Sequence, residues 1–148
     1  MIKYMKMKYL NCVIKPFNAS SNWLQSIALL AARLWIAKVF FMSGLTKVKS
    51  WDTTLMLFAY EYEVPLLSSE IAAYMATGAE LFLPVLLLFG LLTPLAALGL
   101  FIISLVIELF IYPGTTEHYY WLLLLGLLLT HGSGRLGADF WIMKGYSL

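Results

Sequence analysis

Charged residues are scarce in this sequence. Asp, Glu, Lys and Arg make up 12% of its 148 residues, whereas a typical soluble domain has about 25%. Hydrophobic residues make up 61%, above the usual share of about 45–50%. The net charge is only +2, so the chain lacks the basic surface with which proteins bind nucleic acid. This composition excludes an ordinary soluble domain and predicts no nucleic-acid partner.

Groups that hold metals or run dithiol chemistry are also rare. Cys12 is the only cysteine, so the chain alone has neither an internal disulfide nor a CxxC pair. The two histidines, His118 and His131, lie about 20 Å apart if one helix joins them, so they cannot share a metal. Hydrolase, phosphate-loop and dinucleotide motifs are missing. We therefore predict no metal site and no cofactor held within the chain.

The sequence instead contains long apolar runs. Each run is about 20 residues long, enough to cross a hydrocarbon core of about 30 Å. Because backbone groups in lipid must be paired within the chain, and because the runs do not alternate apolar with polar residues, they are predicted to be helices. Thr93-Pro94 and Pro113-Gly114 separate neighbouring runs. The four predicted spans are at about 24–44, 71–92, 95–112 and 119–136.

The predicted fold is therefore all-α, a polytopic membrane four-helix bundle over residues 24–140. A basic segment (1–23) precedes it and a short tail (141–148) follows. Lys and Arg are concentrated beside the two termini, which places both termini in the cytoplasm by the positive-inside rule. The flanking basic residues on that side are Lys3, Lys6, Lys8, Lys15, Arg135 and Lys144, against Lys47 and Lys49 on the other side.

The loop at 45–70 carries a periodic apolar stripe. Its members recur at helical spacing, with Asp52 and Glu61 off the stripe. They are Trp51, Leu55, Phe58 and Tyr62. Two interpretations are open: an amphipathic helix on the outer membrane surface, or an ordered loop that caps the bundle.

Ionisable residues inside the spans are candidate functional groups, because each costs about 2.5 kcal/mol or more at mid-membrane. Arg33 and Glu80 are each the tenth residue of a predicted span, so we expect them at similar depth. A stripe containing Arg33 and Lys47 is expected to face a small-residue stripe containing Glu80, or to share a cavity with it. The pair is either a polar pocket for a headgroup or proton, or an ion pair that fixes helix packing.

Two further charges lie in the outer thirds of their spans. Lys38 and Glu108 match in depth, so they can pair, with Ser104 one turn before Glu108 on the same face. Both are also close enough to the interface for their side chains to reach water, and we expect that arrangement.

Three stretches together resemble the DoxX family of small four-span membrane proteins. The first is Arg33 followed by Phe-Phe-Met-Ser-Gly-Leu-Thr-Lys, which ends at Lys47. The second begins at Ala79-Glu80 and continues to Thr93-Pro94. The third is Gly-Ser-Gly-Arg-Leu-Gly-Ala-Asp, ending at Asp139. The sequence departs from the family ending, which usually reads Gly-Pro-Gly and then has a serine before the aspartate; Ser133 and Gly137 occupy those places here.

The resemblance implies a bacterial inner-membrane protein. Members of that family are linked to quinone-dependent oxidoreductases, as subunits of membrane complexes. The expected function is thus a quinone-interacting or accessory subunit of a redox complex, and catalysis by the chain itself is left open. In this hypothesis Glu80 relays a proton, Arg33 binds a quinone carbonyl, and Lys47 and Glu108 complete the site.

Two other functions are open at this point. The chain is either a scaffold that recruits a partner without chemistry or, with less support, a small-solute transporter, since four spans lack an evident inverted repeat. The expected partners are the lipid bilayer, subunits of a redox complex and a second copy of this chain.

Overall fold

The fold is built from helices. The structure is a computed structural model that describes residues 2–62 and 66–146, with side chains from residue 22 to residue 145 within those ranges. Over these residues it contains no strand, which confirms the all-α prediction. The elements are α1 (Ile2–Lys49), α2 (Trp51–Leu57), the π-helical turn η1 (Phe58–Tyr62), α3 (Ser69–Phe89), α4 (Thr93–Val106), the π-helical turn η2 (Ile107–Ile111), α5 (Thr116–His131) and α6 (Ala138–Tyr146).

Three helical stretches are long and apolar enough to cross a membrane. They are Asn22–Lys49, Ser69–Phe89 and Thr93–Ile111. The fourth predicted span corresponds to α5, whose 16 residues measure about 24 Å at 1.5 Å per residue. The predicted end of the first span at residue 44 was wrong, because α1 continues to Lys49. The helix continues past Lys47, whose ammonium group pairs with Glu80 inside the bundle.

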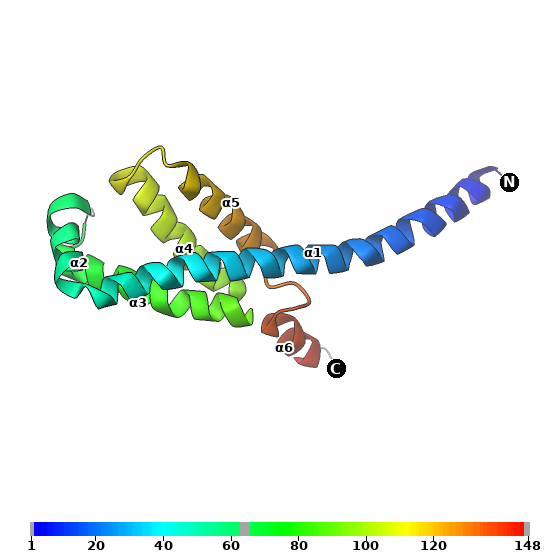
Figure 1. Cartoon of the computed structure of the whole chain (residues 1–148). Helices are drawn as coiled ribbons and strands as arrows, with labels where there is room; N and C mark the ends of the chain where they lie inside the picture. The colour runs from blue at the N-terminus through cyan, green and yellow to red at the C-terminus, as the bar shows by residue number, and fades with distance from the viewer. Residues whose placement is uncertain (1, 63–65, 147–148) are drawn as a thin grey trace.

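The membrane helices pack as a bundle around an apolar core. Figure 1 shows α1 running alongside α3, with α4 and α5 packed together beyond them. Fully buried side chains from four helices meet in the core; they include Ile36, Leu87, Leu100 and Leu125. Gly44 lets α1 approach α3 closely, because a Cβ there would lie 2.9 Å from Leu81. The stripe that contains Lys47 does face the small-residue stripe that contains Glu80, as expected.

Glycine and aspartate organise the turn between α3 and α4. Gly90 ends α3 in the left-handed conformation, with φ of 67°. Leu92, which precedes α4, has no side chain that can cap the helix. Asp139 supplies the cap from the other end of the chain: its carboxylate accepts hydrogen bonds from the Leu92 and Thr93 amides, at 2.7 and 2.9 Å. The C-terminal segment is thereby fixed to the start of α4.

The segment after α1 folds back over one end of the bundle. α2 and η1 lie at the left of Figure 1, opposite the end where α6 lies. Phe58 is buried against Ala72 and Ala73 of α3, and the rest of the predicted stripe packs around that contact. The segment is therefore helical, as the amphipathic-helix interpretation predicted. It also caps the bundle, as the ordered-loop interpretation predicted. We call this the α2 end of the bundle, and the opposite one the α6 end.

Candidate functional site

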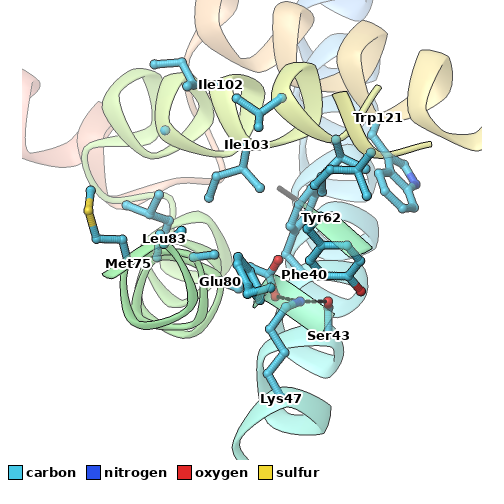
Figure 2. Close-up of a pocket in the computed structure, with 18 of the residues that line it drawn as sticks. Phe40, Ser43, Lys47, Tyr62, Met75, Glu80, Leu83, Ile102, Ile103 and Trp121 are labelled. Carbon is cyan, nitrogen blue, oxygen red and sulfur yellow. Dashed lines mark hydrogen bonds and ion pairs between the residues drawn. The ribbon is translucent and has the colours of Figure 1, made fainter. Parts of the chain in front are cut away.

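A cavity of about 530 Å³ lies between the helices near the α2 end. Figure 2 shows Met75 and Leu83 of α3 on one side, Ile102 and Ile103 of α4 on another, and Phe40 and Trp121 on the side away from Met75. Met75 and Ile102 are more than half exposed, at 60% and 53%. The cavity therefore opens between α3 and α4 on the apolar surface of the bundle, which is the surface that lipid covers.

One wall of the cavity carries an ion pair. Lys47 Nζ lies 2.6 Å from Glu80 Oε2 and also donates to Ser43 Oγ at 2.8 Å (Figure 2). The Glu80 side chain is almost fully buried and that of Lys47 is 18% exposed. A buried carboxylate needs such a partner, because an unpaired charge at this depth costs several kcal/mol. The pair places a charged group in a cavity whose lining is mainly apolar.

A second polar pair adjoins the same cavity. His118, at the start of α5, lines it, and its Nδ1 lies 2.8 Å from Glu108 Oε2 in η2. The other Glu108 oxygen accepts a hydrogen bond from the Gly114 amide at 2.7 Å. Because Glu108 occupies Nδ1, the Nε2 atom of His118 is the ring nitrogen left for a ligand. A carboxylate that binds one ring nitrogen of a histidine in this way determines that the other ring nitrogen faces the ligand.

The structure does not bring Arg33 and Glu80 together. Arg33 is fully buried at the α6 end, where it donates to the Leu136 carbonyl at 3.0 Å and to the Leu87 carbonyl at 3.5 Å. Asp139 is its nearby opposite charge. The expectation that Arg33 reaches the Glu80 site was therefore wrong, and Arg33 does not line the cavity.

The error came from matching the two spans end to end. In the structure Lys47, and not Arg33, comes level with Glu80. Arg33 precedes Lys47 by 14 residues, about 21 Å along a helix. At that distance it meets the end of α3. There Gly90 and Gly137 leave room for the guanidinium, since a Cβ on Gly90 would lie 1.9 Å from an Arg33 nitrogen.

Glu108 also differs from its prediction. It is buried, with 7% of its surface exposed, and it pairs with His118. Glu108 therefore neither pairs with Lys38 nor extends its side chain to water, and both expectations were wrong for this residue. Lys38 is exposed. Glu108 itself does not line the cavity; His118 stands between. Sequence contained a signal for this pair, since Glu108 and His118 flank the Pro113-Gly114 turn and therefore lie at equal depth.

Tyrosines close the cavity at the α2 end. Tyr62 and Tyr112 both line it, and their rings meet edge to face with centroids 6.0 Å apart. The Tyr112 hydroxyl donates to Glu61, and this bond raises the pKa of Tyr112. Burial raises the pKa of Tyr62. Both phenols therefore stay neutral at physiological pH, and they tie η1 to the residue that follows η2.

The apolar helices, the core they share and the laterally open cavity define a polytopic α-helical integral membrane protein. Within that class, the DoxX family model matches residues 28–113, more than half of the chain. The chain belongs to the DoxX family. A relative from Haemophilus influenzae, named only as an uncharacterized protein, is 31% identical over 131 residues, covering 81% of this chain and 86% of its own length. No solved structure matches the chain significantly.

Proposed function

We propose that this protein binds a membrane quinone in the cavity between α3 and α4, as the quinone-interacting subunit of a membrane redox complex. One observation carries the proposal: an apolar cavity open toward lipid contains two separate proton-carrying groups, Glu80 and His118. A water-soluble ligand would not enter from the lipid side, and a plain lipid tail would not need the two groups.

The residues present fit a quinone. The volume of about 530 Å³ lies in the range of small-molecule sites, about 300–1,000 Å³. Its apolar lining suits a ring and an isoprenoid tail, and Trp121 and Tyr62 offer flat faces for the ring. A lateral opening beside Met75 and Ile102 lets a lipid-soluble molecule enter without crossing water.

The two polar pairs have different roles in this proposal. Reduction of a quinone to a quinol takes up two electrons and two protons. The chain has no electron carrier of its own among its motifs, so a redox subunit of the complex supplies the electrons. In this proposal each pair carries one transferable proton, on Glu80 as the carboxylic acid beside Lys47 and on Nε2 of His118 as the imidazolium beside Glu108; these protonated groups donate to the two carbonyl oxygens and deliver the protons. Arg33 has no part in the site and anchors the C-terminal segment.

Orientation follows from the charges. We place the protein in the bacterial inner membrane with both termini, and hence the α6 end, in the cytoplasm. Support comes from Arg135 and Lys144, which lie in the C-terminal segment at that end, and from the positive-inside rule. The α2 end then faces outward.

The test is quinone retention on purification. The protein is isolated from its native membrane in mild detergent, and quinone is extracted and counted per chain. We expect near-stoichiometric quinone in the wild type, loss in Glu80→Gln and reduced retention in His118→Gln. Glu70→Gln is the matched control, because Glu70 is an exposed carboxylate at the start of α3 and lies outside the cavity lining. Equal quinone in Glu80→Gln and Glu70→Gln would contradict the proposal.

A scaffold without chemistry is the second candidate. The observation that favours it is that the Lys47–Glu80 pair joins α1 to α3, so the pair also stabilises the bundle. The double variant Lys47→Glu, Glu80→Lys separates the two functions. Recovery of folding together with quinone retention would favour a structural pair, whereas recovery of folding alone would favour a chemical role for Glu80.

A further inference from the structure

A second cavity lies on the other side of Lys47. It has a volume of about 320 Å³ and is lined by residues of the last turns of α1, of α2 and of η1. We call it the vestibule. Unlike the quinone cavity, it is lined mainly by hydroxyl-bearing residues; these are Ser43, Thr46, Ser50, Thr53, Thr54 and Tyr62. Ser43, Lys47, Phe58 and Tyr62 line both cavities, so they form the partition between them.

The polar groups of the vestibule are arranged to bind water. The Thr46 hydroxyl donates to the Met42 carbonyl, and the Thr54 hydroxyl shares its one hydrogen between the carbonyls of Lys47 and Ser50. With their hydrogens committed to the backbone, these oxygens keep lone pairs that accept from water. A space of about 320 Å³ holds several molecules, since one water occupies about 30 Å³ in the liquid.

Lys47 connects the vestibule to the buried pair. An ammonium group has three N–H donors, and two of them bind Ser43 Oγ and Glu80 Oε2. Among the described residues the third has no partner, while Lys47 retains 18% exposure. A vestibule water is therefore the natural acceptor of the third N–H. Glu80 has 3% exposure and does not line the vestibule, so Lys47 is the residue that joins it to the vestibule.

We propose that the vestibule is a water-filled inlet through which the aqueous phase at the α2 end reprotonates the Lys47–Glu80 pair. Its role as a proton source rests on the proposed quinone site. When Glu80 gives a proton to the bound ligand, a hydronium in the vestibule restores it through Lys47 and leaves a water molecule behind. Protons for this carbonyl thus come from the α2 side of the membrane, whereas lipid-soluble ligand enters from the bilayer.

The inlet is tested by cysteine accessibility in a Cys12→Ser background. Ser43→Cys places a thiol on the partition, and a charged, membrane-impermeant methanethiosulfonate is the probe. Ala79→Cys is the matched control: Ala79 is half-buried, adjoins Glu80 and lines the quinone cavity but not the vestibule. Thr53→Cys, exposed in α2, reports full access from the α2 side. Both faces of the membrane are probed, in spheroplasts and in inverted vesicles.

We expect Ser43→Cys to react from the same face as Thr53→Cys, and at least about tenfold faster than Ala79→Cys, because each unit by which an apolar site raises a thiol pKa removes about nine-tenths of the reactive thiolate. Ser43→Cys reacting no faster than Ala79→Cys, or only from the opposite face, would overturn the inlet. The quinone count is made on the wild type and is therefore independent: labelling of Ser43→Cys, together with a wild type that retains no quinone, would leave the inlet standing and refute the proposed function.

Discussion

Gly90→Ala is predicted to destabilise the protein strongly, because Gly90 is constrained twice. Its φ of 67° lies in the left-handed region, which costs an alanine about 1–2 kcal/mol. Its Cβ would also lie 1.9 Å from an Arg33 nitrogen and 2.6 Å from the Gly137 Cα. The second contact is backbone and cannot move aside cheaply, so overpacking adds about 1–3 kcal/mol. We therefore expect a total loss of about 2–5 kcal/mol in the free energy of unfolding.

The measurement is denaturant titration in detergent micelles, followed by helical circular dichroism. Gly78→Ala is the control, because Gly78 lies within α3 and a Cβ there meets nothing within 4 Å. Helix propensity predicts that this control gains up to about 1 kcal/mol. If Gly90→Ala and Gly78→Ala proved equally stable, the close packing of Gly90 on Arg33 and Gly137 would be refuted.

Two further predictions concern contacts outside the cavity. Asp139→Asn removes a charged cap from two α4 amides, so the free energy of unfolding should fall by about 2 kcal/mol in the same titration; an unchanged value would contradict the cap. The hydrogen bond to Glu61 raises the Tyr112 pKa, so its stabilisation is complete below about pH 10 and is lost as the pH rises through the raised value. Tyr112→Phe should therefore be less stable than wild type at neutral pH, with the difference shrinking in alkali; a constant difference would refute this.

Much of the architecture could be predicted from sequence because length and hydrophobicity determine it. Runs of about 20 apolar residues must be helices in lipid, and the period of Trp51, Leu55 and Phe58 predicted a helix at the α2 end. Helix boundaries were less accurate. Lys47 resembled the end of a span, since a charge is costly in lipid unless it has a partner, and that partner, Glu80, is 33 residues away.

The site could be predicted only in part, for the same reason. Glu80 and Lys47 were expected to be site residues, and both line the cavity. Their pairing depends on the register of α1 against α3, which in the structure differs from the predicted one by the 14 residues between Arg33 and Lys47. Glu108 was expected near the interface, but the π-helical turn η2 and the Gly114 amide hold it inward, where it meets His118. The only sequence signal for the Glu108–His118 contact is that the two residues lie on either side of the Pro113-Gly114 turn and hence at equal depth.

Photoaffinity labelling tests the central claim, a quinone in the cavity between α3 and α4, most directly. An azido-quinone is added to the protein in membranes and illuminated, and the modified residues are located by mass spectrometry. We predict label on cavity-lining residues of α3 and α4, such as Leu83 and Ile103, with loss of that label in excess unmodified quinone. Label spread over lipid-facing residues such as Phe82 and Leu123, and insensitive to competitor, would contradict the account.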